Sequence, residues 1–327
     1  VDRGGRISAT NLRIDGEPMA VERAGAPPAP ARPAVDAAPP LFAAPKPAPK
    51  RADPPAITAT VPSSPNAMRD VGAPVQPAAN GNGSYSLARQ LGLGVARIVI
   101  DAGHGGHDPG AIAHRTTEAE ITLDIALRLE KLLLKQPGTD VLLTRRSDVF
   151  VPLEERTAIA NRQDADLFLS IHANVGRNPT ARGVETYFLN FASNPEAEAV
   201  AARENAGSGM AMHHLPDIVR KIALNNKLDE SRDLAHIVQG SLYRRLRQQN
   251  TQIRDRGVKQ APFVVLIGAQ MPSVLAEVSF VTNKQEAALL KTAAYRQRIA
   301  QALFDAVVKY RQSLKKVSAI ASMGETR

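Results

Sequence analysis

The sequence contains no cysteine and no tryptophan, and only 5 tyrosines and 8 phenylalanines occur among its 327 residues. Without cysteine the chain has no disulfide, no thiolate metal site and no cysteine nucleophile. No apolar run reaches the ~20 residues that a membrane span needs, so we expect no transmembrane segment. The scarcity of aromatic residues leaves no stacking platform of the kind that binds single-stranded nucleic acid.

The chain carries a formal net charge of +9. A basic protein favours anionic partners, which include nucleic acid, acidic lipid headgroups and an acidic polymer such as bacterial cell wall. The basic cluster YRRLRQQNTQIRDR, Tyr243 to Arg256, lies at the end of a predicted helix. No nucleic-acid recognition motif accompanies it, so we expect no nucleic-acid partner. A surface rich in lysine and arginine is the simpler explanation of the charge.

Proline is concentrated at the start of the chain, where 16 of the 24 prolines precede residue 80. Residues 25–90 are mostly Ala, Pro, Lys and Asp, which predicts a disordered linker that is partly polyproline II. Residues 1–24 fit either the remnant of an N-terminal targeting domain or disorder. The chain begins with Val1 and shows no signal peptide, so we expect a fragment or processed form that has lost an export signal. Residues 317–327 form a C-terminal tail.

Strand-like and helix-like segments alternate over residues 91–316. This alternation predicts a single α/β domain with a mixed, largely parallel central sheet flanked by helices. Apolar residues at helical spacing mark an amphipathic helix over Glu118–Gln136. The expected strands are ARIVIDAG, TDVLLTR, DLFLSIHAN, RGVETYFLN, APFVVLIGA and PSVLAEVSFVTN, and the other expected helices are VPLEERTAIANRQ, DESRDLAHIVQGSLYRRLRQQ and KQEAALLKTAAYRQRIAQALFDAVVKYRQSL.

Two histidines and a glutamate stand next to predicted strand and helix ends. His104 follows the first strand between two glycines, whose missing side chains let a ligand or metal approach the backbone. His172 lies near the carboxyl end of DLFLSIHAN, where sites form in open α/β sheets. Glu118 begins the helix after the glycine-rich loop, so its carboxylate can point back to the same place. Two histidines and one glutamate suit a catalytic zinc ion and leave a fourth position for water.

Glu277 interrupts the apolar strand PSVLAEVSF, so its carboxylate is either paired with a buried Arg or Lys or functional. The other three residues also have ordinary explanations, as hydrogen-bonded histidines or as a helix-start charge favoured by the dipole. Their grouping around one sheet favours a site, although the sequence does not show that they converge. Three further polar residues either orient the histidines or cap strand ends: Asp101, Ser170 and Asn174.

Five stretches, in order and spacing, resemble the zinc-dependent N-acetylmuramoyl-L-alanine amidases, a family of bacterial cell-wall hydrolases: IVIDAGHGGHDPGAI, LFLSIHAN, GVETYFL, RGVKQAPFVVL and MPSVLAEVSFVTN. The resemblance covers residues 91–314. It implies that His104, Glu118 and His172 are the zinc ligands and that Glu277 is the catalytic carboxylate. A helical H-E-x-x-H run and a G-x-S-x-G elbow are both absent, which argues against another class of metallopeptidase and against a serine nucleophile.

One position departs from the family pattern. Ala119 stands where family members usually carry a lysine after the ligand glutamate. A register shifted by two residues would make Glu120 the ligand instead. The spacing to LDIALRL favours Glu118, and Glu120 fits a solvated helix charge.

The resemblance implies hydrolysis of the amide between N-acetylmuramic acid and the L-alanine of the stem peptide in peptidoglycan. It further implies a periplasmic enzyme of cell-wall remodelling and daughter-cell separation. A non-catalytic peptidoglycan-binding module with the same fold is the alternative, and the presence of all four key residue types argues against it.

Residues 192–229 are long for a loop and partly helical by pattern. Some members of the resembled family carry an inserted helix here, which covers the metal until an activator protein displaces it. By this resemblance Glu204 is a candidate inhibitory fourth ligand, and Met210–Ile218 is the stretch whose deletion tests the idea. A surface helical excursion is the alternative.

Overall fold

A six-stranded sheet at the centre of the fold places four parallel strands side by side and reverses the last two. The structure is a computed structural model that describes residues 94–208 and 227–314, together with residue 83. The strand order is β4-β1-β5-β8-β6-β7; β6 runs antiparallel to β8 and parallel to β7. The strands are β1 (Arg97–Ala102), β4 (Asp140–Leu143), β5 (Leu167–Asn174), β6 (Val184–Leu189), β7 (Asp255–Ala261) and β8 (Ser273–Phe280). This mixed, largely parallel sheet confirms the predicted fold class.

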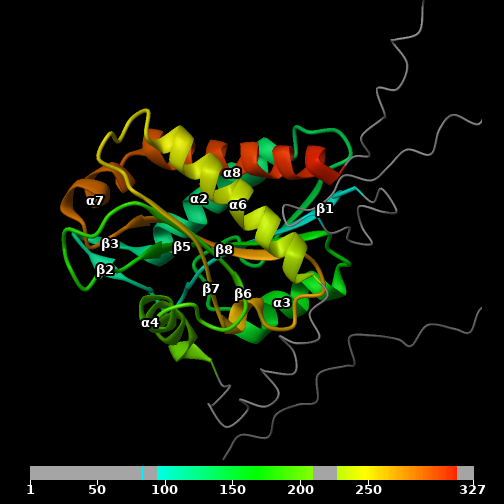
Figure 1. Ribbon diagram of the computed structural model, residues 1–327, viewed down its shortest axis with the longest axis horizontal. Helices are drawn as coiled ribbons and strands as arrows, with labels where there is room; N and C mark the ends of the chain where they lie inside the picture. Colours follow the sequence, from blue (N-terminus) through cyan, green and yellow to red (C-terminus); the bar gives the residue numbers. More distant parts are fainter. Residues whose placement is uncertain (1–82, 84–93, 209–226, 315–327) are drawn as a thin grey trace, which may run out of the picture. The chain divides into compact units, whose positions relative to one another are not determined.

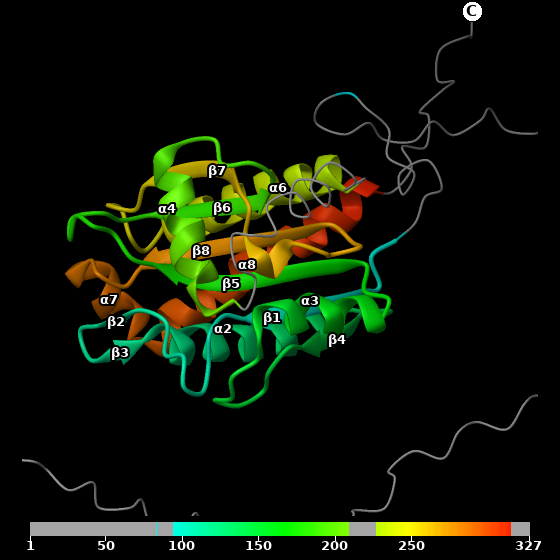
Figure 2. The same ribbon diagram turned by 90° about the horizontal axis from the view of Figure 1, so that it is seen from below.

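Helices cover both faces of the sheet (Figures 1 and 2). One face carries α2 (Glu118–Leu133), α6 (Leu228–Leu246) and α8 (Ala293–Leu314), and the other carries α3 (Leu153–Arg162), α4 (Pro195–Glu204) and the short 3-10 helix η3 (Val264–Leu266). The remaining elements are the β2–β3 hairpin (Ile112–Ala113 and Thr116–Thr117), η1 (Asn205–Gly207) and α7 (Lys284–Leu290). Among residues 94–208 and 227–314, no helix combines the length and the apolar character of a membrane span.

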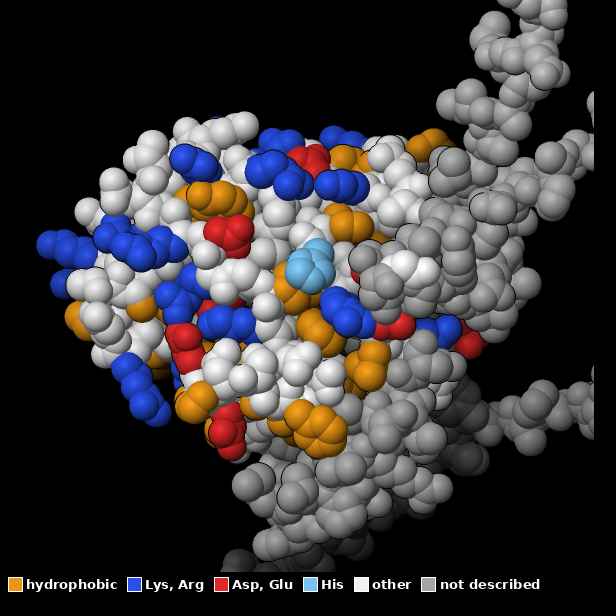
Figure 3. Space-filling model, in the orientation of Figure 1, with side chains coloured by type: hydrophobic (Ala, Val, Ile, Leu, Met, Phe, Trp, Pro, Cys, Tyr) orange, Lys and Arg blue, Asp and Glu red, His pale blue; other side chains and the backbone are white. Residues whose placement is uncertain are grey.

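Basic side chains gather in two places on the side of the molecule that Figure 3 shows. One group lies over α6 and α8, and another lies at the left edge, beside α7 and the loop that joins β5 to β6. Part of the positive net charge of the sequence therefore lies in clusters of basic side chains on the surface.

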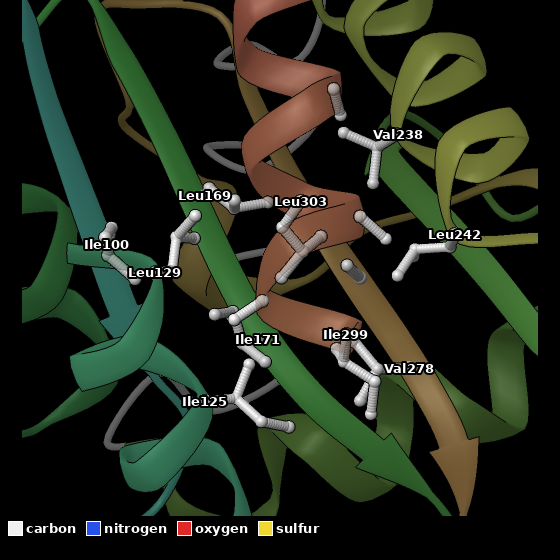
Figure 4. Close-up of a cluster of buried hydrophobic side chains, with 14 of the residues drawn as sticks. Ile100, Ile125, Leu129, Leu169, Ile171, Val238, Leu242, Val278, Ile299 and Leu303 are labelled. Atoms are coloured by element: carbon white, nitrogen blue, oxygen red, sulfur yellow. The ribbon is translucent and has the colours of Figure 1, made fainter. Parts of the chain in front are cut away.

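Two apolar clusters fix the layers. The larger one joins the sheet to α2, α6 and α8, and Figure 4 shows Leu129, Leu169 and Leu303 meeting in it. The smaller one packs the opposite face against α3, α4 and η3, with Phe168 and Phe263 fully buried. Because both faces of β5 and β8 are covered, every residue of these two strands is buried, which explains their nearly continuous apolar sequence.

The expected strand APFVVLIGA was wrong. Strand β7 ends at Ala261, Pro262 follows, and Val264–Leu266 forms η3. Proline has no N–H to donate to the sheet, and the apolar side chains after it fill the smaller core instead. The true edge strand, DRGVKQA, is mostly half-buried and polar, so it lacks the apolar signal of the buried strands.

The parallel strands β1, β5 and β8 all end at the same edge of the sheet. Four predicted segments lie outside the described residues: the remnant at 1–24, the linker at 25–90 apart from residue 83, the tail at 317–327 and the segment Met210–Ile218. The boundaries of the described domain at 91–316 stay predictions.

Candidate metal centre

Four side chains from four different elements meet at the carboxyl edge of the parallel strands. They are His104 after β1, Glu118 at the start of α2, His172 in β5 and Glu204 at the end of α4, and one ligand atom of each lies within 4.8 Å of all the others. The structure therefore brings together the three predicted zinc ligands and the candidate inhibitory ligand.

The distances within this cluster are those of ligands around a small cation. His104 Nε2 lies 3.3 Å from Glu118 Oε2 and 3.2 Å from Glu204 Oε2. His172 Nδ1 lies 3.1 Å from Glu118 Oε1 and 3.1 Å from Glu204 Oε2. Ligands at ~2.0–2.1 Å from a tetrahedral zinc ion stand ~3.3 Å apart. His104 Nε2 and Glu204 Oε2 are buried and have no hydrogen-bond partner among the described residues, so a cation fits this donor set.

Glu118 is fixed by backbone donors on two sides. Its Oε2 accepts a hydrogen bond from the Ala111 N–H at 3.0 Å, and its Oε1 accepts one from the Ala173 N–H at 2.8 Å. Glu120, two residues along α2, has a 61% exposed side chain and pairs with Arg296. The helix therefore turns Glu118 toward the histidines and Glu120 toward the surface.

His104 has an unusual backbone conformation, with a φ of 61°. A residue with a side chain adopts this left-handed region only where its surroundings hold it there. Its Nδ1 lies 2.8 Å from Asp108 Oδ2, and its carbonyl accepts a hydrogen bond from Arg156 Nη2 at 3.0 Å. Asp108 thereby orients the ring so that Nε2 faces the cluster.

Two positions near the cluster must be glycine because histidine rings lie very close to their backbone. A Cβ on Gly103 would lie 2.5 Å from Cε1 of His172, and a Cβ on Gly110 would lie 2.6 Å from Cδ2 of His104 and 2.9 Å from Cβ of Glu118. Gly110 also has a φ of 62°, which favours glycine. The glycines that interrupt this loop therefore make room for the candidate ligands themselves.

The Gly103→Ala variant is expected to lower the free energy of unfolding by about 1–3 kcal/mol, because the added methyl group forces the buried His172 ring to shift. Urea unfolding measures this loss. Gly94→Ala is the matched control, since nothing lies within 4 Å of its Cβ and its φ is not in the left-handed region. An equal loss in both variants would contradict the steric explanation.

Glu277 lies on β8 directly beside His172 of β5, with Glu185 of β6 on its other side. Side chains in one row across a sheet point to the same face, so Glu277 faces the cluster. Both of its carboxylate oxygens are buried without a hydrogen-bond partner among the described residues. Burial, and then the negative charge of Glu204, raise the pKa of Glu277 well above its usual range. The raised pKa favours the protonated form of the carboxyl group.

The cluster attracts positive charge. Burial alone would lower the pKa of His104, but the Glu118 carboxylate outweighs it and raises that pKa to about 12. For His172, burial is likewise outweighed by the Glu204 carboxylate, which raises the pKa to about 9. Protons or a metal cation can supply the positive charge that these carboxylates demand.

The surroundings of this site match a known family. A family model described as N-acetylmuramoyl-L-alanine amidase matches residues 98–309, which include the whole cluster. This chain belongs to that family. The resemblance stated from sequence motifs alone is thereby confirmed, and the chain is an enzyme, an N-acetylmuramoyl-L-alanine amidase that acts on peptidoglycan.

Relatives of the amidase include both sequences and a solved structure. N-acetylmuramoyl-L-alanine amidase AmiA of Escherichia coli K12 is 37% identical over 224 residues, which are 65% of this chain and 75% of AmiA. AmiC of Escherichia coli O6:H1 is 32% identical over 226 residues, which are 65% of this chain and 52% of AmiC. The catalytic domain of CwlV, an amidase from Bacillus (Paenibacillus) polymyxa var. colistinus, is 28% identical with a TM-score of 0.51, and the match covers 65% of this chain and 97% of that domain.

Sequence reasoning missed the residues that position the site of the amidase. Asp108 orients His104. The sequence pattern that could have indicated this role is an acidic residue four positions after a histidine in a glycine-rich loop. Of the three polar residues left open, Asp101 accepts hydrogen bonds from Ser170 and pairs with Arg156, which in turn holds the His104 carbonyl. Asn174 takes part in a different network, on the side of α4.

That network holds Glu204 in the site. Arg203 Nε donates to Glu204 Oε1 at 3.1 Å, and Arg203 Nη2 donates to Asn174 Oδ1 at 2.9 Å. The Asn174 amide in turn donates to the buried Glu185 carboxylate, which also binds Lys259. A chain of contacts therefore ties the end of α4 to strands β5, β6 and β7 of the amidase.

Proposed function

We propose that the chain is a zinc-dependent amidase in which His104, Glu118 and His172 hold the metal and Glu277 is the catalytic carboxylate. The scissile bond is the amide between the lactyl group of N-acetylmuramic acid and the L-alanine of the stem peptide. The observation that carries the proposal is the convergence of three donor side chains, two of them with an unpartnered buried Nε2, beside an unpartnered buried carboxyl group.

The residues of the chain divide the reaction between them. Zinc, when bound, supplies a Lewis acid that polarises the amide carbonyl and lowers the pKa of water. Glu277 accepts the proton of the attacking water and passes it to the amide nitrogen, so the C–N bond breaks and a free L-alanyl amine leaves. The burial that raises the Glu277 pKa suits the first step, because a raised pKa makes the carboxylate a stronger base toward the proton of the water.

We further propose that α4 inhibits the enzyme through Glu204. Glu204 Oε2 stands 3.2 Å from His104 Nε2 and 3.1 Å from His172 Nδ1, in the place that a fourth ligand takes. Its position excludes water and substrate from that place. An activator protein that displaces α4 would open the site, and the alternative of a surface helical excursion is disfavoured by the burial of Glu204, which is 8% exposed.

The cellular setting follows from the resemblance and from the charge. Family membership together with a net charge of +9 supports action on an acidic cell-wall polymer. We propose a periplasmic location and a role in cell-wall remodelling and daughter-cell separation. Fractionation of cells that express the full protein, with detection in the periplasmic extract, tests the location.

Digestion of purified peptidoglycan tests the activity. The full chain, and the chain with Glu204→Ala, are incubated with and without chelator, and the soluble products are read by mass. Stem peptides that begin with L-alanine, lost with chelator and restored by zinc, are expected. Zinc bound to an open site with no such product would contradict the amidase and favour the alternative, a non-catalytic peptidoglycan-binding module.

A further inference from the structure

A large basic pocket adjoins the candidate metal centre. Its volume is about 920 Å³, and its lining includes five arginines but a single carboxylate, Glu196. A volume of this size is typical of sites that enclose a ligand, ~300–1,000 Å³. The five arginines are Arg177, Arg182, Arg203, Arg254 and Arg256.

The pocket begins where the catalytic strands end. Asn174 in its lining is two residues beyond His172 on β5, and Phe280 is three residues beyond Glu277 on β8. Arg203, also in the lining, pairs with Glu204 at 3.1 Å. The pocket therefore lies within reach of one of the two arms of a substrate whose scissile amide is at the cluster.

Three of the arginines form no ion pair among the described residues, although the charge of Arg182 still acts on the buried Glu286 carboxyl group: burial raises the pKa of that group, and Arg182 partly offsets the rise. Among the described residues, no carboxylate lies within ion-pair distance of Arg177, Arg182 or Arg254. Arg182 donates from Nη1 to Gln252 at 3.3 Å, and its Nε is buried without any partner among the described residues. The loop between β5 and β6 carries two of these three arginines, and basic side chains gather beside it in Figure 3.

Helix α4 forms one wall of the pocket and supplies its only acid. Glu196 pairs with Arg256, whose guanidinium also binds Glu185 and lies over the Phe280 ring at 5.1 Å. If α4 leaves with Glu204, it takes Glu196 away. The arginines that lie outside α4 then face the open site with no acid of the pocket lining among them.

The two arms of the substrate differ in charge. The glycan arm offers hydroxyl and amide groups, whereas the peptide arm carries free carboxylates. Arginine guanidinium groups bind carboxylates in a bidentate geometry that neutral groups do not match. We propose that this arginine pocket is the subsite for the carboxylate-bearing stem peptide, and this inference rests on the proposed function. The enzyme then selects stems with free carboxylates over stems whose carboxylates are amidated.

Paired synthetic substrates test the inference. Two muramyl peptides are compared that are identical except for a free carboxylate or a carboxamide at the second stem residue. In the full chain with Glu204→Ala, KM is expected to be about tenfold lower for the free acid with similar kcat, because charge-assisted hydrogen bonds add affinity. Arg182→Ala and the Arg177→Ala/Arg254→Ala pair are expected to remove most of this difference.

Arg298→Ala is the matched control, because Arg298 Nη1 donates to Gln248 at 3.3 Å, just as Arg182 Nη1 donates to Gln252. It lies on α8, outside the pocket lining, and should keep the full preference. Urea unfolding of each variant separates a lost subsite from a lost fold. Equal KM values for acid and amide in the parent enzyme would overturn the inference and leave the arginines to a protein or lipid partner.

A binding measurement keeps this result distinct from the proposed function. Calorimetric titration with the free stem dipeptide, L-alanyl-D-glutamate, and with its amide needs no turnover. Tighter binding of the acid, weakened by Arg182→Ala, supports the subsite even if neither substrate is hydrolysed. Equal binding of both peptides overturns the subsite even if the enzyme is active.

Discussion

Replacing Glu277 with glutamine is expected to lower kcat for amide hydrolysis by about 10²–10⁴-fold, the range typical of a lost general acid–base group. Glutamine keeps the size of the side chain but has no oxygen that can accept and return the proton. Zinc content should stay at the parent value, because Glu277 is not among the four cluster ligands. Hydrolysis of muramyl peptide and metal analysis of the same sample measure the two quantities.

The fold provides a second readout for this variant. Both oxygens of Glu277 are buried without a partner among the described residues. Replacing a buried, unpartnered carboxyl group with a neutral amide of the same size should leave the free energy of unfolding unchanged or higher. Glu120→Gln, on the exposed side of α2, is the control and should keep the parent rate. A Glu277→Gln enzyme within a few-fold of the parent rate would show that another group moves the proton.

Replacing Glu204 with alanine is expected to raise the basal rate by about 10–100-fold, which corresponds to a closed state favoured by about 1.4–2.8 kcal/mol. The fourth position of the cluster then opens, and His104, Glu118 and His172 still hold the metal. Initial rates on peptidoglycan without any activator measure the gain. Glu198→Ala is the matched control, because Glu198 lies exposed on the same helix.

Arg203 supplies an independent check on this inhibition. Its guanidinium joins Glu204 to Asn174, so Arg203→Ala should also raise the basal rate, by less than Glu204→Ala. Both variants should keep the parent zinc content. A Glu204→Ala enzyme that loses zinc together with activity would instead make Glu204 a resident ligand, and the inhibition proposal would fail.

Much of the fold was readable from periodicity. The helix over Glu118–Gln136 was found to within a few residues, as α2, because its apolar residues repeat at helical spacing. The strand APFVVLIGA was wrong because a short apolar run has no period that separates a buried strand from a buried turn of helix. The 3-10 helix forms here because Phe263 packs into the smaller core, a contact that the sequence does not reveal.

The candidate site was readable in part. Glycines around a histidine and charged residues within apolar strands depart from the usual pattern of a buried strand, so they can be recognised in the sequence. The residues that position the candidate ligands do not depart from any such pattern. Asp108, Arg203 and Glu185 are common polar residues, and their partners are fixed by which strands lie side by side.

Motifs and periodicity are local properties of the chain, so they were enough to indicate the class of fold, the family and the residue types of the centre. Three features depend on packing between distant segments: Glu118 rather than Glu120 faces the histidines, Glu204 reaches the same point, and an arginine pocket adjoins it. These features join residues far apart in the sequence, such as His104 in the cluster and Arg256 in the pocket lining. The pairing of strands β5, β6 and β8 brings them together, and no local pattern encodes that pairing.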